Sequence, residues 1–202
     1  MKIGCIVEGH GEEQAVPILL RRLVERIDPA TAARLSIPVT LRVSRDKLKK
    51  SGELERSVEL VARRLEGQGA VLVLIDAEED QVCVLAPELL ARARGQRGDL
   101  PIAVVLAKRQ FEAWFAAAAG SLAGYRSLPA DLGVPADPEL GSAKKWLKDK
   151  MSRSYSETLD QPAFTARFDL DAARRSPSFD KLWRDVSRLL REAGSAASSD
   201  PA

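Results

Sequence analysis

Six apolar residues in succession, Ala70-Val71-Leu72-Val73-Leu74-Ile75, run directly into the acidic segment Asp76-Ala77-Glu78-Glu79-Asp80. An apolar run of this length is typical of a parallel strand that is covered on both faces. An earlier stretch, Lys2-Ile3-Gly4-Cys5-Ile6-Val7, leads in the same way into Glu8-Gly9-His10-Gly11-Glu12. In an open parallel sheet, ligands bind outside the carboxyl ends of the strands. The two acidic segments are therefore predicted to meet at one crevice.

Strands and stretches of helical periodicity alternate through the first half of the chain. Two more strands are predicted over 37–43 and 101–107, and Pro38 restricts the first of them to an edge of the sheet. Apolar residues repeat at helical spacing from about Pro17 to Ile27, and over 54–65, 87–94 and 111–119. Gly9 and Gly11 are predicted to allow a tight turn into the first helix. The alternation predicts an α/β fold whose four-stranded parallel sheet has the order 2-1-3-4.

The second half of the chain has a different composition. Residues 120–138 are rich in Gly, Pro, Ala and Asp, which is typical of a connecting stretch. Helices are predicted over 139–151 and after a capping Ser178. The sequence thus predicts an α/β domain over 1–120, a helical extension packed on it over 121–192, and a disordered tail over 193–202.

Length and composition restrict the class of protein. The chain has 202 residues and a formal net charge of +2, so it has no bulk polyelectrolyte character. Its two cysteines, Cys5 and Cys83, have no metal-ligand spacing and suit a reducing compartment. The sequence has neither a signal-peptide pattern nor an apolar run long enough to span a bilayer. We therefore expect a cytoplasmic protein with no membrane partner.

The acidic crevice predicts a metal site. Carboxylates that converge there would repel one another and resist desolvation, and a hard divalent cation would relieve that strain. Oxygen ligands suit Mg²⁺ or Mn²⁺. The candidate ligands are Glu8, Asp76, Glu78 and Asp80, and the accessory candidates are Glu12, Glu112, Lys108 and His10. Glu13 and Glu79 are interpreted as solvated neighbours.

These acidic motifs resemble the Toprim superfamily, the metal-binding domain shared by topoisomerases, bacterial primases and the overcoming-lysogenization-defect nucleases. Its pattern is a glutamate after strand one and Asp-x-Asp, sometimes Asp-x-Asp-x-Asp, after strand three. Glu8 matches the first element, and Asp76 and Asp80 match positions of the second. Glu78 stands where the superfamily usually has its second aspartate. The resemblance implies a Toprim-like fold that binds Mg²⁺ or Mn²⁺.

A nearer resemblance is to the bacterial Toprim-like domain-of-unknown-function family 4276. It rests on Val7-Glu8-Gly9 with Glu12, on Pro17 and the leucines after it, on the Asp76 segment, and on Phe111-Glu112-Ala113-Trp114-Phe115. The last segment is also similar to one in the RloB-like defence proteins. The resemblance extends from Met1 to about Leu190 and implies a setting in phage defence or mobile elements. It supplies no reaction.

The leading functional hypothesis is a metal-dependent nuclease. Asp76 would hold metal, and Glu8 would act as a ligand or as a general acid and base. Residues 140–192 carry 12 Lys and Arg against 8 Asp and Glu, an excess of +4 that suits a nucleic-acid surface. The candidates for that surface are Arg109, Lys144, Lys145 and Lys148.

Two alternatives stay open from the sequence. The first is a non-catalytic or partner-dependent Toprim-like module, which works with a protein from a neighbouring gene in a defence complex. Glu78 and the loose placement of Tyr125 and Tyr155 favour it. The second is a phosphoryl receiver with Asp76 as acceptor and Lys108 as paired cation. A receiver usually needs two acids after strand one and a fifth strand, and neither is evident in the sequence.

Overall fold

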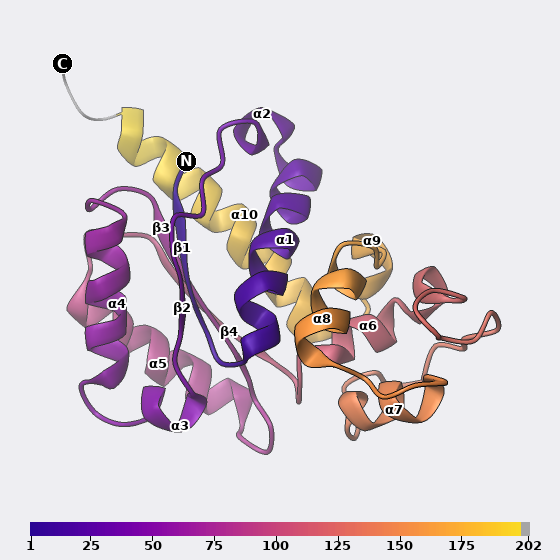
Figure 1. The fold of residues 1–202 in the computed structure, drawn as a ribbon. Coiled ribbons are helices and arrows are strands. Elements are labelled where there is room, and N and C mark those ends of the chain that lie inside the picture. Colours follow the sequence, from indigo (N-terminus) through magenta and orange to yellow (C-terminus); the bar gives the residue numbers. More distant parts are fainter. Residues whose placement is uncertain (199–202) are drawn as a thin grey trace.

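The computed structural model describes residues 1–198, and four parallel strands form its sheet (Figure 1). The order is β2-β1-β3-β4, which confirms the predicted topology. The strands are β1 (Ile3–Val7), β2 (Thr40–Arg42), β3 (Ala70–Asp76) and β4 (Ile102–Ala107). Val7 pairs with Leu74 in adjacent parallel strands, so Glu8 and Asp76 follow at the same edge of the sheet.

Helices cover both faces of the sheet because the strand side chains are apolar on both (Figure 1). Leu72 and Leu74 of β3 pack on the side of α1 (His10–Ile27) and α10 (Pro177–Ser198). Val71 and Val73 pack on the side of α4 (Glu53–Arg64) and α5 (Val82–Gln96). The short helices α2 (Pro29–Ala32) and α3 (Arg45–Leu48) flank β2 along the chain.

Helix α1 begins seven residues before Pro17, so the prediction that regular helix starts near this proline was wrong. The Glu12 carboxylate accepts hydrogen bonds from the backbone N–H groups of Glu8, at 2.9 Å, and Gly9, at 3.2 Å. These bonds fix the first turn, in the manner of a capping box. The proline then removes only one bond from an otherwise anchored helix. Helix α5 likewise begins before its proline, Pro87.

Gly11 is required for close packing and not for a turn. Neither it nor Gly9 has a positive φ, so the predicted role of these glycines in a tight turn was wrong. A Cβ on Gly11 would lie 2.0 Å from Oε1 of Gln161 and 2.5 Å from the carbonyl oxygen of Glu157. Both residues belong to α8 (Glu157–Thr165). The missing side chain thus lets α8 lie directly on the start of α1.

Gly11→Ala is therefore expected to destabilise the protein by about 2 kcal/mol, because overpacking forces backbone to move. Thermal unfolding measures this as a fall in melting temperature of about 6 °C. Gly95→Ala in α5 is the matched control, since a Cβ there meets nothing within 4 Å. It should leave the melting temperature unchanged or raise it slightly. An equal fall in both variants would contradict the packing role of Gly11.

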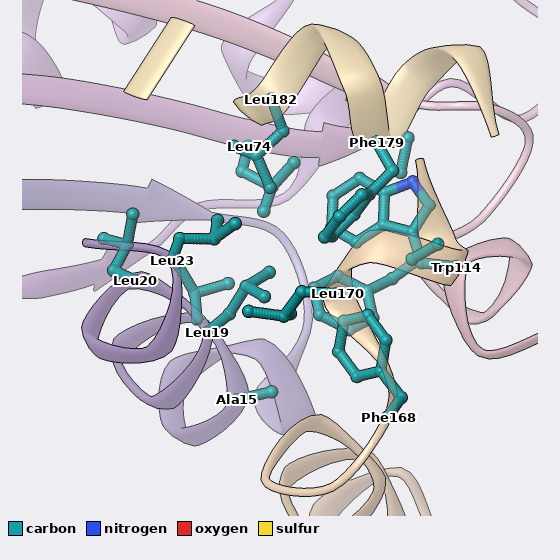
Figure 2. Packing of buried hydrophobic residues seen from close by; sticks show 14 of the residues in the cluster. Ala15, Leu19, Leu20, Leu23, Leu74, Trp114, Phe168, Leu170, Phe179 and Leu182 are labelled. Atoms are coloured by element: carbon teal, nitrogen blue, oxygen red, sulfur yellow. The ribbon is translucent and has the colours of Figure 1, made fainter. Parts of the chain in front are cut away.

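The helical segments after β4 share their core with the sheet. They are α6 (Glu112–Ala117), the 3₁₀ helix η1 (Ala119–Leu122), α7 (Ala143–Lys150), α8 and α9 (Leu170–Ala173). Figure 2 shows Trp114, Phe168 and Phe179 in one apolar cluster with Leu74 of the sheet and Leu19 of α1. The rings of Trp114 and Phe179 meet edge to face, with centroids 5.3 Å apart. Residues 121–192 are thus part of one continuous apolar core with the sheet.

Two boundaries in the second half differ from those predicted. Helix α7 begins at Ala143 and not at Glu139, because the buried Glu139 carboxylate instead accepts a 2.8 Å hydrogen bond from the backbone N–H of Ser178 at the start of α10. Helix α10 continues to Ser198, so residues 193–198 of the expected tail are helical, as their alanines allow. The rest of that tail lies outside the described residues. None of the described helices is long and apolar enough to span a membrane.

Candidate functional site

Glu8 and Asp76 lie at the carboxyl end of the sheet, where the two central strands finish. Asp76 is the last residue of β3 and is 8% exposed. Its Oδ1 accepts a 2.8 Å hydrogen bond from the backbone N–H of Phe111, which precedes α6. Glu8 is half-buried, and its Oε2 is enclosed without a hydrogen bond from any described residue.

Two further carboxylates join them from neighbouring helices. Glu12 from α1 and Glu112 from α6 are buried, at 4% and 1% exposure. Tyr155 donates its hydroxyl to Oε1 of Glu112 at 3.0 Å, whereas Oε2 of Glu112 is buried and accepts no hydrogen bond from residues 1–198. We refer to Glu8, Glu12, Asp76 and Glu112 as the carboxylate cluster.

Burial raises the pKa of every member of the cluster, and repulsion within the cluster raises the pKa of Asp76 and Glu12 further. For Asp76, burial raises the pKa well above its ordinary range, and the charges of Glu12 and Glu112 raise it further. Burial and the charges of Glu8 and Glu112 raise the pKa of Glu12 to about 7. Burial also raises the pKa of Glu8, although Arg45 opposes this, and the pKa of Glu112, although Lys144 opposes it. The cluster is therefore electrostatically strained when all its members are ionised.

A lysine from α7 lies beside the cluster. The Nζ of Lys144 is 3.1 Å from Oε1 of Glu157, and its side chain is 25% exposed. Burial lowers the pKa of Lys144, but Glu112, Glu157 and Asp76 raise it on balance to about 12. The sequence placed Lys144 on a nucleic-acid surface and gave no role to Tyr155 or Glu157. These contacts join segments far apart in the chain, so no local motif indicates them.

The acids after β3 are distributed among different partners. Asp80 pairs with Arg45, at 3.2 Å from Nη1, and with Lys49, at 2.9 Å from Nζ. Glu79 pairs with Arg109 on the surface. Glu78 has a positive φ of 48°, and its charge acts on Glu8. The chain thus leaves the extended conformation of β3 at Glu78, where a turn forms.

The other accessory candidates lie outside the cluster. His10 is exposed and its Nδ1 is 3.2 Å from Oε2 of Glu13. Lys108 is exposed after β4. Lys145 pairs with Asp149 on the solvent side of α7. Lys148 lines a surface pocket with Arg153 and Tyr155, whose hydroxyl reaches Glu112 from that side.

The donors of the cluster are of the right chemistry for a hard cation but are not gathered into a ligand set. Among residues 1–198, no group of three or more His, Cys, Asp or Glu side chains is arranged to hold a metal ion. The Glu12 carboxylate accepts from the backbone N–H groups of Glu8 and Gly9. Asp76 accepts from the backbone N–H of Phe111, and Glu112 from the hydroxyl of Tyr155. The enclosed oxygens of Glu8 and Glu112 retain free lone pairs. Binding of a cation at this place would require these side chains to leave their present hydrogen-bond partners.

Comparison with known proteins gives a family but no function. A model of the family described as a domain of unknown function, DUF4276, matches residues 7–187. No curated protein matches the chain, and no solved structure does.

Proposed function

Because the chain belongs to the DUF4276 family, whose description assigns no activity, we propose a function from the carboxylate cluster itself. We propose a Toprim-like protein that depends on Mg²⁺ or Mn²⁺ and processes phosphodiesters, as a nuclease of phage defence or mobile elements. The supporting observation is a pair of enclosed carboxylate oxygens, on Glu8 and Glu112, that no described residue satisfies. A buried acceptor without a donor is costly, and a bound cation would satisfy such an oxygen.

The roles of the residues follow from their positions. Asp76 and Glu8 would hold the ion at the ends of the two central strands. Glu78 and Glu112 are in the same region, and their charges act on Glu8 and Asp76 respectively. Asp80 could contribute only after it leaves its ion pairs. A bound Mg²⁺ or Mn²⁺ would supply Lewis-acid chemistry and a more acidic water. Glu8, whose pKa is raised mainly by burial, would be suited to accept a proton at this edge of the sheet.

A phosphodiester would need a basic surface beside this acidic site. Lys148 and Arg153 line the pocket that Tyr155 joins to Glu112, which gives a chain of contacts from the surface to the cluster. Arg109 and Lys145 lie on the surface, each paired with a single exposed carboxylate. Such pairs are weak, so phosphates can displace them.

The test is cleavage by the purified protein. We expect Mn²⁺-dependent nicking of DNA or RNA at low salt, weakened by added salt. Glu8→Gln should lower the rate by about 100-fold or more, since it removes a ligand and a proton acceptor. Glu13→Gln is the matched control, because Glu13 lies on the same helix but pairs with His10 and Arg42. If wild type with Mn²⁺ neither binds nor cuts DNA or RNA, the chain alone is not a nuclease.

A partner-dependent module is the second candidate, and the burial of the carboxylate cluster favours it. Asp76 and Glu112 are 8% and 1% exposed, so a substrate cannot reach them until the helical segments above them move. A partner protein that moves these segments would then be needed for activity. Under this hypothesis the isolated chain binds Mn²⁺ but leaves nucleic acid intact.

A further inference from the structure

A surface pocket of about 640 Å³ lies at the end of α7, beside the carboxylate cluster. Tyr155 joins the two places, because it lines the pocket and donates its hydroxyl to Glu112 at 3.0 Å. None of the described residues that line the pocket is acidic. They are Lys148, Met151, Ser152, Arg153, Ser154 and Tyr155. Two cationic side chains and no carboxylate make this pocket suited to an anion.

The buried Asp160 holds one wall of the pocket in place. Its carboxylate accepts hydrogen bonds from Nη1 of Arg153, at 2.9 Å, and from the backbone N–H of Ser156, at 2.8 Å. Arg126 donates to the same carboxylate at 2.8 Å. Among residues 1–198, neither guanidinium has a second acidic partner. One carboxylate therefore balances only one of the two arginines, and the 38% exposed side chain of Arg153 keeps positive charge at the pocket.

Three further donors of the pocket are unused within the described part of the chain. The Lys148 ammonium has no ion pair there, and the hydroxyls of Ser152 and Ser154 have no hydrogen bond. All three side chains are exposed and open to a ligand. Ammonium, guanidinium and hydroxyl groups are the side-chain donors that proteins direct at phosphate oxygens.

A strained turn supports the pocket. Arg126 and Ser127 have positive φ angles of 46° and 70°, which residues other than glycine rarely adopt. The carbonyl oxygen of Ser127 accepts a 3.1 Å hydrogen bond from the backbone N–H of Ser152, so this turn fixes a residue of the pocket. Backbone strain of this kind costs free energy and is concentrated at ligand-binding and catalytic sites. The strain is thus an observation independent of charge that marks the same place.

We propose that this pocket binds a phosphate group of a nucleic-acid strand, without a metal ion. Arg153 and Lys148 would contact the phosphate oxygens, and Ser152 and Ser154 would add neutral donors. At about 640 Å³ the pocket also has room for the adjoining sugar. The inference rests on the proposed function only in naming the strand as the substrate. Because Tyr155 separates the pocket from Glu112, the bound phosphate would be a neighbour of the one that reacts.

The test measures DNA binding with metal removed by EDTA. Fluorescence anisotropy of a labelled single-stranded DNA gives the dissociation constant for wild type, Lys148→Gln and Lys150→Gln. Both lysines are exposed on α7 and lack an acidic partner among residues 1–198, but of the two only Lys148 lines the pocket. At about 0.1 M salt, charges more than about 10 Å from the strand are largely screened.

We expect Lys148→Gln to bind the DNA about tenfold more weakly and to lower the slope of log affinity against log salt by about 0.7, the value of one phosphate contact. Lys150→Gln should change the affinity by less than about twofold and leave the slope unchanged. Inorganic phosphate should compete with the DNA for wild type and much less for Lys148→Gln. A glutamate peptide of the same charge as the DNA should compete poorly, because it offers carboxylates in place of phosphates.

The outcomes separate this inference from the proposed function. Equal losses in the two variants, or an unchanged salt slope in Lys148→Gln, overturn the inference even if wild type cleaves DNA with Mn²⁺. Competition by the glutamate peptide as strong as that by DNA overturns the assignment to phosphate and points to an acidic protein partner. The expected loss in Lys148→Gln without any cleavage by wild type leaves the pocket standing and overturns the nuclease.

Discussion

Asp76→Asn is expected to make the protein more stable in the absence of metal. The aspartate is buried among Glu12 and Glu112, and its pKa is raised well above its ordinary range, first by burial and then by these charges. Asparagine removes the charge and can still accept the 2.8 Å hydrogen bond from Phe111. Because a raised pKa means that the ionised carboxylate is disfavoured in the folded protein, the melting temperature at pH 8 should rise, by about 4 °C if about 1 kcal/mol of repulsion is removed. Residues that stabilise when neutralised are typical of functional sites.

The same variant should change how stability depends on pH. A carboxyl group with a raised pKa holds its proton more tightly in the folded protein, so its stabilising contribution is complete below the unfolded pKa and is lost as pH rises through the folded pKa. For Glu12 that loss falls between about 4 and about 7. Wild type should therefore lose stability across this window, and Asp76→Asn should lose less.

Wild type and Asp76→Asn should also differ in how Mn²⁺ changes their melting temperatures. Mn²⁺ should raise the melting temperature of wild type and have little effect on Asp76→Asn, which would lack the central ligand of the proposed metal site. Glu79→Gln is the control, because Glu79 is exposed and pairs only with Arg109 on the surface. A lower melting temperature for Asp76→Asn without metal would mean that the cluster is a stabilising network and not a strained site.

Asp160→Ala is expected to destabilise the protein clearly. The Asp160 carboxylate is fully buried at the start of α8 and binds Arg126, Arg153 and the backbone N–H of Ser156, the last at 2.8 Å. Burial alone would raise its pKa, but these hydrogen bonds lower it on balance. Removal leaves two partly exposed guanidinium groups without this carboxylate. Because solvent screens both groups, we expect a cost of about 2 kcal/mol, below that of a fully buried pair. The melting temperature should fall by about 6 °C.

Acid should produce the same loss in wild type. Because the pKa of Asp160 is lowered in the folded protein, its contribution is present above the unfolded pKa and disappears as pH falls through the folded pKa. The gap between wild type and Asp160→Ala should therefore narrow below about pH 4. Asp149→Ala is the matched control, since Asp149 is exposed and pairs only with Lys145, a contact worth about 1 kcal/mol at most. Equal losses in the two variants would contradict the role of Asp160.

The sequence was sufficient to predict the sheet and the acids at its edge. Six apolar residues before Asp76 and a similar run before Glu8 define two buried parallel strands, and Pro38 defines an edge. These signals are local, because a strand covered on both faces must be apolar at every position. The rule that parallel strands present their carboxyl ends on one side then brings Glu8 and Asp76 together.

Helix boundaries were less predictable, for a physical reason that recurs. Pro17 and Pro87 lie inside helices because capping bonds and packing compensate for one lost hydrogen bond. Gly11 is dictated by contact with α8, which is about 150 residues away in the chain. Propensity describes a residue and its neighbours, whereas these positions depend on partners distant in the sequence.

The surroundings of the acids were decided by tertiary structure alone. Lys144 and Lys145 are adjacent and alike in sequence, yet the backbone of Lys144 is anchored by Gln110 and its ammonium pairs with Glu157, whereas Lys145 pairs with Asp149 on the solvent side. Glu112 joins the cluster because α6 begins where Phe111 binds Asp76. The sequence determined which carboxylates end the strands, since that depends on local apolar pattern. Which charges cover, oppose and bury them depends on how helices distant in the chain pack over that edge.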